Sequence, residues 1–382
     1  MAKADRKRIG FLMNNDDLGV IYYLSNIVQS LDYLDDEKKP VILLLFNEST
    51  QKHLSIFSEY PYIEEHSITY PNLFILYIYS FVRQENYFLN NLFEKYKLRG
   101  ILPANDILFR STSKERKMVA WITDFQHKFY PRLFGIVNRT VRNLRFKNAF
   151  QNANDVILSS LDSQSHLQKF YKKINAKIHV LNFVSHANRI VTANSVEILN
   201  KYNIQKPYFI VSNQFYKHKN HIVVLEAIKK MIEMKYLNFE VVFTGKKEDY
   251  RDKNFFPSIE KFIDINSLAN YVKILGVIPR NEQIILFKNA EAAIQPSLFE
   301  GWNSSIEDAK TLNQQVICSD ILVHHEQMSD RAFYFNPKDS LSLAITMLNM
   351  LTHAQNRLPI FDDFKKRVIK FASDFINIFD EN

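Results

Sequence analysis

The chain has 382 residues, which is too long for one ordinary hydrophobic core and suits two domains of roughly 150 to 200 residues each. Hydrophobic residues make up 46% of it and charged residues 24%, a balance that excludes a disordered or fibrous protein. The net charge is +8, and between Arg132 and Lys177 nine Lys or Arg residues stand against two acids. That segment suits an anionic partner, such as nucleic acid, a membrane surface or a phosphate-bearing substrate. A plain solvated surface is an equal alternative, and no zinc-finger, RNP or recognition-helix pattern supports nucleic acid.

The longest apolar runs are VILLLF (41–46) and LFILYIY (73–79), which have the length of strands and fall far short of the roughly 20 residues that span a bilayer. The N-terminal segment lacks the apolar stretch and cleavage site of a secretory signal. The single cysteine, Cys318, excludes an internal disulfide and a cysteine-based zinc cluster. We therefore expect a cytoplasmic protein in which Cys318 is a buried strand residue.

The first half alternates between strand-like and helix-like segments. RIGFLM (8–13) leads to a helix in which Ile21, Leu24 and Val28 recur at helical spacing, and VILLLF reads as a fully buried strand of a parallel sheet. Further strands are expected at 118–123, 155–160 and 177–183, and a long helix near 131–151. This order predicts an α/β domain with a parallel sheet.

A second α/β series starts at Pro207, after a polar segment that we interpret as a linker with a short helix. Its expected strands are PYFIVS, FEVVFTG, YVKILG and EAAIQPS, and helices separate them. Two such units in sequence predict ligand binding at the carboxyl ends of the strands, in a cleft between the units. We divide the chain into a first domain at 1–184, a linker at 185–206, a second domain at 207–358 and a C-terminal helix at 359–382 that returns to the first domain.

Several motifs of other enzyme classes are missing from the sequence. The absence of GxGxxG and GxxxxGK[ST] argues against dinucleotide oxidoreductases and P-loop enzymes, and HExxH and GxSxG are absent too. We assign no metal site and no cofactor. Among only seven glycines, four follow strands or lie at turns into helices, as in phosphate-binding turns: Gly19, Gly245, Gly276 and Gly301. Ordinary turn geometry is the simpler explanation for any one of them.

Two segments of the second half stand out, VSNQFYKHKNHIVVLEAI (211–228) and LGVIPRNEQIILFKNAEAAIQPSLFEGWNSSIEDA (275–309). The first resembles the strand, loop, Lys-Asn-His and helix element of the retaining nucleotide-sugar glycosyltransferases of family 4, and the second resembles the donor-site segment of the same family. Supporting matches in the first half are LGVIYYLSNIVQSL (18–31), WITDFQHKFYPRLF (121–134) and ANDVILSSLDSQSHL (153–167). The resemblance implies the α/β GT-B fold, with two Rossmann-like domains whose parallel sheets face a central cleft and a C-terminal helix that packs back on the first domain.

The resemblance also implies the residues that hold a nucleotide-diphosphate sugar. A departing diphosphate needs cations and backbone N–H groups, which Lys219 and the helix start at Asn303, Ser304 and Ser305 would supply. Glu300 would face the donor sugar, and an acid at the helix start would hold the ribose, because a carboxylate accepts two directional hydrogen bonds. Asn213 and Gly245 complete the expected donor-binding set.

Two details depart from the family pattern. The position in register with the second family glutamate is Asp308, whereas Glu307 comes one residue earlier and points about 100° away on a helix. We favour Asp308 for the ribose and Glu307 for a capping box at the helix start. The second departure is in the phosphate loop, where the usual arginine is missing and Lys217 or the loop amides would replace it.

In the first half, the resemblance implies that His127 touches the transferred sugar, with Asp124 nearby. A histidine in an aromatic loop is otherwise often only a packed residue. Gly19 would contact the donor, while Asp16 and Asp17 either cap a helix or take part in the site. We expect His221 to pack at a helix start and His218 to face solvent.

The helix around 136–147 carries an apolar stripe of Val137, Val141 and Leu144 and, on another face, three arginines, Arg139, Arg142 and Arg145. If the acceptor is lipid-linked, the arginine face is a candidate for peripheral contact with an anionic membrane on its inner side. A solvated face is an equal alternative.

Together with the resemblance, these features predict a metal-independent transferase that moves a hexosyl or deoxyhexosyl group from a nucleotide-diphosphate sugar to a saccharide or lipid-linked hydroxyl. Retention of configuration is implied by the resemblance alone. Polysaccharide biosynthesis is the expected setting. Two alternatives stay open within the same fold, a sugar-nucleotide epimerase and a non-catalytic partner subunit of a transferase. The sequence leaves the sugar, base, acceptor, linkage and oligomeric state undetermined.

Overall fold

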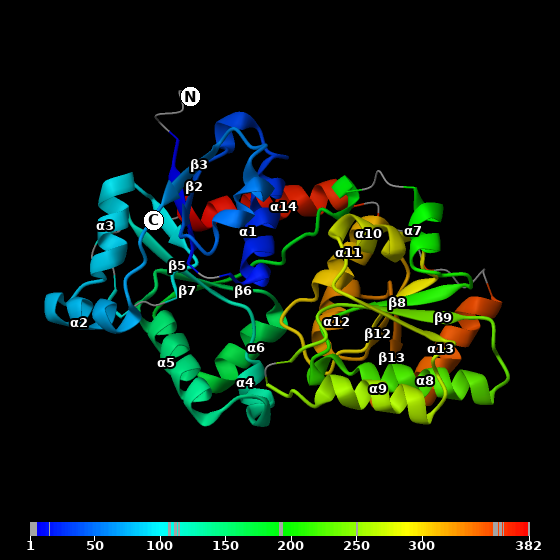
Figure 1. Cartoon of the computed structure of the whole chain (residues 1–382). Helices are drawn as coiled ribbons and strands as arrows, with labels where there is room; N and C mark the ends of the chain where they lie inside the picture. Colours follow the sequence, from blue (N-terminus) through cyan, green and yellow to red (C-terminus); the bar gives the residue numbers. More distant parts are fainter. Residues whose placement is uncertain are drawn as a thin grey trace. The chain divides into compact units, whose positions relative to one another are not determined.

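The computed structural model describes residues 6–14, 16–105, 108–110, 113, 115–190, 194–249, 251–353, 358, 361 and 363–380 (Figure 1). The chain divides into two compact units, Met1–Val184 together with Lys365–Asn382, and Ser185–Phe364. Each unit is built on a parallel sheet of its own.

The sheet of the first unit has seven strands in the order β3-β2-β1-β4-β5-β6-β7, and all neighbours are parallel. The strands are β1 (Arg8–Met13), β2 (Val41–Phe46), β3 (Ile63–Ser67), β4 (Gly100–Leu102), β5 (Lys117–Ile122), β6 (Asp155–Leu158) and β7 (Lys177–Val180). The α-helices are α1 (Leu18–Leu31), α2 (Leu73–Arg83), α3 (Tyr87–Tyr96), α4 (Gln126–Phe129), α5 (Ile136–Asn152), α6 (Leu161–Phe170) and α14 (Phe364–Asp380). Short 3-10 turns are η2 (Asp36–Lys38), η3 (Gln51–Phe57) and η4 (Pro131–Leu133).

The core of the first unit lies against the central strands. All six side chains of β2 are buried, as the continuous apolar run VILLLF predicts for a strand inside a parallel sheet. Leu43 and Leu45 of that strand share one core with Phe93 of α3 and Phe150 of α5. The strands and helices therefore have the α/β arrangement that the alternating sequence pattern indicates.

Helix α14 belongs to the first unit, although it follows the second in sequence (Figure 1). Phe375 meets Phe11 of β1 edge to face, with 6.0 Å between ring centroids. Lys117 Nζ donates to the Ile378 carbonyl at 2.6 Å. A Cβ at Gly100 would lie 2.2 Å from the Phe379 ring, so this strand position requires glycine. The predicted return of the C-terminal helix to the first domain is confirmed.

The sheet of the second unit has six parallel strands in the order β10-β9-β8-β11-β12-β13. The strands are β8 (Tyr208–Ser212), β9 (Glu240–Thr244), β10 (Val272–Gly276), β11 (Ala292–Gln295), β12 (Val316–Ser319) and β13 (Phe333–Phe335). The α-helices are α7 (Ser195–Lys201), α8 (His221–Glu233), α9 (Phe255–Ile265), α10 (Arg280–Asn289), α11 (Ser304–Leu312), α12 (Leu322–Met328) and α13 (Ser340–Thr352). The 3-10 turns are η5 (Ala187–Ile190) and η6 (Lys217–Lys219). Cys318 is buried in β12, as expected.

Both faces of the second sheet are covered by helices. Alternate residues of β8 enter different cores: Phe209 packs with α8, α9 and α13, whereas Ile210 packs with α7, α10 and α11. This period of two follows from the strand pleat, and it explains why the strand reads as a continuous apolar run. Ile198 and Ile204, within the segment interpreted as a linker, are buried in the second of these cores, so residues 194–206 are integrated into the second unit.

The apolar run at 73–79, which has the length of a strand, forms helix α2. Asn72 caps its first turn by accepting from Phe74 N, and Gln84 ends it in a left-handed conformation with φ 56°. Within the described residues, none of the helices combines the length and apolar character needed to cross a bilayer.

Candidate active site

The second unit brings the expected donor-site residues to one edge of its sheet. Strands β8 and β11 are parallel neighbours, and they end at Ser212 and Gln295. Because parallel strands deliver their carboxyl ends to the same edge, the loops that follow them meet there. Asn213 opens the first loop, and Glu300 lies in the second.

Glu300 forms a largely buried ion pair with Lys219. The Lys219 Nζ lies 2.5 Å from Glu300 Oε1, and the two side chains are 17% and 9% exposed. Asn303 Nδ2 donates to the same carboxylate oxygen at 3.1 Å. Lys219 ends the turn η6, and one residue, the N-cap Asn220, separates it from α8; Asn303 directly precedes α11. A cation, a carboxylate and two helix N-termini therefore converge where little water screens them.

A buried amide network fixes the loops around this pair. Gln295 Oε1 accepts from Asn213 Nδ2 at 2.9 Å and from Asn303 Nδ2 at 3.2 Å. Ser305 Oγ donates to the Ser212 carbonyl at 2.7 Å, which ties α11 to the end of β8. These buried hydrogen bonds connect the loop after β8, the end of β11 and the start of α11.

Gly245 allows two loops to approach each other closely. Its φ is +136°, and a Cβ there would lie 2.2 Å from the Asn213 carbonyl oxygen. Its N–H donates to the Gly276 carbonyl at 2.8 Å. Only glycine fits both the conformation and the space.

The start of α11 differs from the expected capping box. Asn303 is the N-cap, and its side-chain oxygen accepts from Ile306 N at 3.1 Å. Glu307 instead pairs with Lys310 Nζ at 2.9 Å and accepts from Gln327 Nε2 at 3.1 Å. The capping role assigned to Glu307 is therefore wrong. Asn303 takes it because its short side chain reaches the free N–H groups of the first turn directly.

Asp308 lies in a different setting from its neighbour. Its Oδ1 accepts from Arg280 Nη2 at 2.6 Å and from Ser185 Oγ at 2.5 Å. Its side chain is 4% exposed, and that of Arg280 is 36% exposed. The two adjacent acids thus have separate cations, Lys310 for Glu307 and Arg280 for Asp308, as expected for residues about 100° apart on a helix.

Two histidines of η6 and α8 are buried. His221 stacks on Phe215 with 4.3 Å between ring centroids, in agreement with the expected packing role. His218, expected to face solvent, is buried, because the turn η6 directs it inward; Leu298 N donates to its carbonyl at 2.8 Å. Burial lowers the pKa of His218 to about 2 and that of His221 to about 3, so both rings are neutral near pH 7.

In the first unit, His127 is a buried residue of α4. Its Nε2 lies 3.0 Å from Asn143 Oδ1, so this nitrogen carries the hydrogen and Nδ1 is the acceptor of a neutral ring. Nδ1 is buried and has no hydrogen-bond partner among the described residues. Burial, assisted by the nearby Arg142 cation, lowers the pKa of His127 to about 4. The ring is therefore suited to accept a hydrogen bond rather than to act as a cation.

The other expected residues of the first unit follow its first and fifth strands. Asp124 Oδ1 accepts from Gln126 N at 2.8 Å and lies 3.4 Å from Arg142 Nη2. Asp17 caps α1 by accepting from Gly19 N at 2.8 Å, and Gly19 is exposed. The helix-capping explanation is correct for Asp17, whereas Asp16 pairs with Lys52 and His53.

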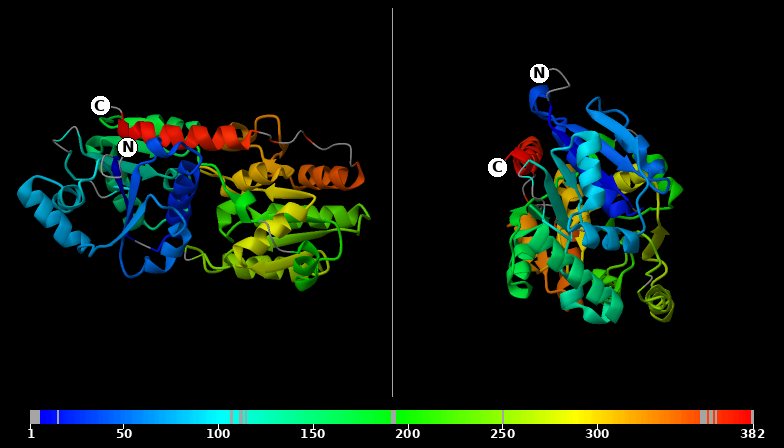
Figure 2. Two further views of the ribbon diagram at one scale, coloured as in Figure 1. Left: turned by 90° about the horizontal axis from the view of Figure 1, so that it is seen from above. Right: turned by 90° about the vertical axis from the view of Figure 1, so that its left-hand side faces the viewer.

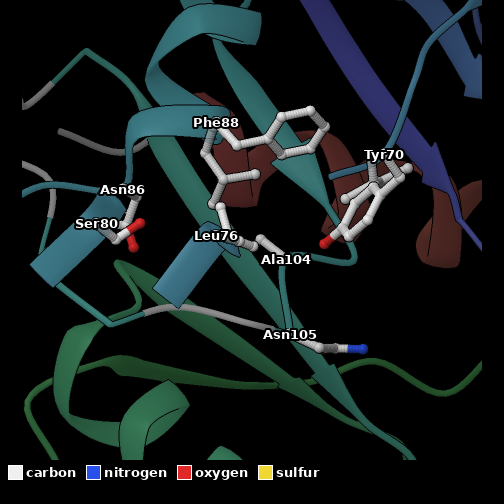
Figure 3. Close-up of a pocket in the computed structure, with 9 residues that line it drawn as sticks. Tyr70, Leu76, Ser80, Asn86, Phe88, Ala104 and Asn105 are labelled. Carbon is white, nitrogen blue, oxygen red and sulfur yellow. The ribbon is translucent and has the colours of Figure 1, made fainter. Parts of the chain in front are cut away.

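A pocket of the first unit lies apart from these residues. Its lining includes Leu12, Leu76, Phe88 and Asn105, and Figure 3 shows several of these side chains around it. It lies beside α2 and holds none of the residues expected to bind the donor. Among the described residues, no group of three or more His, Cys, Asp or Glu side chains is arranged to hold a metal ion.

Comparison with known families identifies the second unit. Residues 195–359 match the family model described as glycosyl transferases group 1. The second unit is a group 1 glycosyl transferase domain. A curated relative, the O-antigen chain mannosyltransferase RfbU of Salmonella typhimurium, is 24% identical over 235 residues, which is 62% of this chain and 61% of that protein. The chain thus matches about three fifths of the length of this curated relative.

Solved structures match nearly the whole chain. The Anabaena Alr3699/HepE structure in complex with UDP and glucose has a TM-score of 0.70 at 14% identity, covering 98% of this chain and 99% of that one. WaaG, a glycosyltransferase involved in lipopolysaccharide biosynthesis, has a TM-score of 0.61 at 12% identity, covering 97% of each chain. The sucrose-phosphate synthase of Thermosynechococcus elongatus has a TM-score of 0.65 at 12% identity, covering 98% of this chain and 94% of that one. At these identities the likeness establishes the fold, so the predicted GT-B fold is confirmed.

Sequence reasoning missed two polar residues of the glycosyl transferase domain. Arg280 begins α10 and pairs with Asp308, and its Nη1 donates to Gln283 Oε1 at 2.7 Å. Gln283 Nε2 donates to Ser212 Oγ at 2.6 Å, so both residues reach the carboxyl ends of the strands. The available signal was Pro279 followed by Arg280 at a strand-to-helix turn. Lys217, named in the sequence analysis as a substitute for the missing arginine, is 61% exposed, and its Nζ lies 3.9 Å from Asp252 Oδ2.

Proposed function

We propose that the chain transfers a sugar from a nucleotide-diphosphate sugar to a hydroxyl group of a polysaccharide or glycolipid precursor, with retention of configuration. The observation that carries the proposal is the Glu300–Lys219 pair between two helix N-termini, at the carboxyl ends of β8 and β11. The mannosyltransferase relative and the neighbours solved with UDP and glucose support the same class of reaction.

In this proposal the diphosphate is held by Lys219 and the first amides of α11. Ser304 and Ser305 are the first residues of α11, where backbone N–H groups have no acceptor within the helix, so these groups are suited to donate hydrogen bonds to phosphate oxygens. As the bond between sugar and diphosphate breaks, negative charge grows on the leaving group, and these donors stabilise it. A metal ion is not required for that stabilisation.

Glu300 then orients the donor sugar. Its Oε1 already accepts from Lys219 and Asn303, so the carboxylate is fixed before substrate arrives. A preformed acceptor costs no reorganisation when the sugar hydroxyls bind. Asp308 holds the ribose through Oδ2, because both of its contacts with Arg280 and Ser185 use Oδ1.

In the first unit, the proposal assigns His127 to a hydroxyl of the transferred sugar and Gly19, which is exposed at the start of α1, to the donor. A ring that burial keeps neutral can accept a hydrogen bond from a hydroxyl group.

The test combines a ligand screen with matched variants. A thermal-shift screen of UDP-, GDP- and dTDP-sugars should find one donor that adds about 2.7 kcal/mol of stability at 100 times its dissociation constant. With that donor, Lys219→Met should lower the transfer rate by about 10²-fold or more, since it removes a donor to the leaving group. The control is Lys217→Met, an exposed lysine two residues earlier, which should change the rate by only a few-fold.

Three outcomes would contradict the proposal in different ways. Conversion of the donor alone into an epimer would identify a sugar-nucleotide epimerase. Unchanged transfer by both Glu300→Ala and His127→Ala would indicate a non-catalytic subunit. Loss of transfer on treatment with EDTA, restored by a divalent cation, would show that the reaction needs a metal.

A further inference from the structure

A glutamine of helix α12 holds the backbone of Asn303, the residue that begins α11. The Gln327 Oε1 accepts from Asn303 N at 3.0 Å, and the Gln327 Nε2 donates to the Asn303 carbonyl at 3.1 Å. Both residues are buried, with 4% of Gln327 and 2% of Asn303 exposed. One side-chain amide therefore satisfies both backbone groups of a residue that water does not reach.

This double contact depends on the backbone conformation of Asn303. The residue is extended, with φ −89° and ψ 113°. In an extended residue the N–H and C=O groups point to the same side, as they do toward a neighbouring strand. In a helical residue they point in opposite directions along the axis, so one amide could not bind both. The Gln327 amide takes the place of a strand partner and thereby selects the extended conformation that an N-cap needs.

The conformation of Asn303 determines the geometry of the candidate donor site. Its Nδ2 donates to Glu300 Oε1 at 3.1 Å and to Gln295 Oε1 at 3.2 Å. Its backbone leads directly into Ser304 and Ser305, the first residues of α11. A rotation of Asn303 would therefore move both the carboxylate proposed to hold the sugar and the amides proposed to hold the diphosphate.

Gln327 is itself fixed by its surroundings in the second unit. Helices α11 and α12 contact each other, and Figures 1 and 2 show them in yellow-orange and orange. The Gln327 Nε2 also donates to Glu307 Oε1 of α11 at 3.1 Å. One turn earlier on α12, His324 Nδ1 lies 2.9 Å from the Ser319 carbonyl oxygen at the end of β12. The amide that holds Asn303 is thus anchored to a strand and to a helix.

We propose that Gln327 is a positioning residue for transfer, which acts through Asn303 to direct the first amides of α11 toward the diphosphate and Glu300 toward the sugar. The inference rests on the proposed function of this site. It separates two parts of the donor, because Asp308, the residue proposed for the ribose, is held by Arg280 and Ser185. Gln327 should therefore contribute to the binding of the diphosphate and not to that of the nucleoside.

A second buried glutamine provides a matched comparison at the other end of α11. Gln314 is 7% exposed and follows Asn313, the C-cap of the helix. Its Nε2 donates to the Phe287 carbonyl at 2.7 Å and to the Ala290 carbonyl at 2.5 Å. Both glutamines connect α11 to neighbouring backbone, but only Gln327 does so at the end that faces the proposed diphosphate. A role in stability alone would give the two residues the same effect on ligand binding.

The test compares Gln327→Met with Gln314→Met in the full-length chain. Methionine keeps the approximate length and volume of glutamine but lacks the amide, so each variant leaves two buried backbone groups without their partner and should lower the urea midpoint. Calorimetry with UDP, GDP and dTDP, and with uridine, guanosine and thymidine, measures the two parts of the donor. Gln327→Met should weaken the binding of the preferred diphosphate about tenfold or more and change that of its nucleoside by less than about twofold. Gln314→Met should leave both affinities within about twofold of wild type.

Two further measurements support the comparison. With the preferred donor sugar, Gln327→Met should lower kcat about tenfold and leave the KM of the acceptor unchanged, since the acceptor does not bind the diphosphate amides. Gln327→Asn is the second variant in case Gln327→Met does not fold. Its amide is one methylene too short to bind both backbone groups of Asn303, so the same selective loss of diphosphate affinity is expected.

The outcomes distinguish this inference from the proposed function. Wild-type diphosphate affinity in the folded Gln327 variants, equal losses for diphosphate and nucleoside, or the same selective loss in Gln314→Met would each overturn the role of Gln327 and leave the proposed function standing. If the wild-type chain binds none of the three diphosphates, the proposed function fails, and the role of Gln327 fails with it.

Discussion

Glu307 and Asp308 show how two adjacent acids acquire different chemistry from one helix turn. Glu307 is 1% exposed and paired with Lys310, whose side chain is 9% exposed, so both partners lie in a dry environment. Asp308 is paired with Arg280, which reaches solvent. Loss of Glu307 would leave the Lys310 charge buried without a partner, which is costly, whereas Arg280 without Asp308 can still be hydrated. For this reason we propose Asp308, and not Glu307, as the acid that binds the ligand.

Conservative substitutions at the two acids should therefore have opposite effects. Glu307→Gln should lower the free energy of unfolding by about 3 kcal/mol, since it strands Lys310, and it should leave nucleotide affinity within a few-fold of wild type. Asp308→Asn should cost little stability and should weaken nucleotide binding about tenfold, because it replaces the proposed ribose acceptor. Urea unfolding and calorimetry with UDP, GDP and dTDP measure both. The reverse pattern of affinities would assign the ribose to Glu307.

At this scale the sequence predicted residue types better than residue partners. Glu300, Lys219 and Asn303 could be found because they lie in the two segments that resemble the family, and the structure brings them within hydrogen-bond distance. The partner of Asp308 could not be found, because Arg280 lies 28 residues earlier and meets it only when β10 and β11 are placed in one sheet. The prediction that His218 faces solvent was wrong for a related reason, since the direction of a side chain in a 3-10 turn does not follow from the sequence.

Among the structural elements, the loop after β9 sets the tightest geometric requirement of the second unit. Gly245 lies against the Asn213 backbone in a conformation that L-residues rarely adopt. The same backbone carries the Asn213 side chain to Gln295, so the position of one loop determines that of the other. A change at Gly245 should therefore be transmitted to the neighbouring strand ends.

Gly245→Ala should destabilise the second unit by about 2 kcal/mol or more and weaken nucleotide binding, because the new Cβ would displace the Asn213 loop. Gly135→Ala is the matched control, since a Cβ there would meet nothing within 4 Å and its φ is −59°. We expect that change to cost less than about 1 kcal/mol. Urea unfolding and nucleotide affinity of the two variants provide the comparison, and equal effects would show that the loop contact is unimportant.

Secondary structure could be predicted from the sequence where burial on both faces makes a strand continuously apolar. It could not be predicted for the apolar run that forms α2. Strands such as β2 and β8 are apolar because both faces of their sheets are covered. The apolar run of α2 has the same composition but the opposite environment, and its helical state depends on the Asn72 cap and the turn at Gln84. Apolar composition alone cannot distinguish a core strand from a helix whose outer side is exposed.

At the scale of the whole molecule, burial keeps the rings of four histidines neutral, His127, His218, His221 and His324. Burial lowers the pKa of His127 and of His324 to about 4, of His221 to about 3 and of His218 to about 2, from an ordinary value of 6.5. The unfolded chain therefore binds more protons than the folded chain once the pH falls below about 6.5. Acid destabilises the protein throughout the window from about pH 6.5 down to the folded-state values.

Replacing one of these rings should remove part of that pH dependence. Each such histidine lowers the free energy of unfolding by about 2 kcal/mol between pH 7 and pH 5. His221→Phe keeps the stack on Phe215 and should reduce the total pH-dependent loss by about that amount. Urea unfolding at the two pH values measures the loss, and His353→Asn, at an exposed position, is the control. An unchanged loss in His221→Phe would mean that this ring is not kept neutral.

The position of α14 has a consequence for how the protein is made on the ribosome. The helix that covers Phe11 and Gly100 is translated only after the entire second unit. Until then the nascent first sheet lacks the side chains of Phe375 and Phe379 and exposes apolar surface that chaperones recognise. The second unit, whose residues are contiguous, can fold as soon as it emerges. The first unit, whose synthesis begins first, is therefore the unit that completes its folding last.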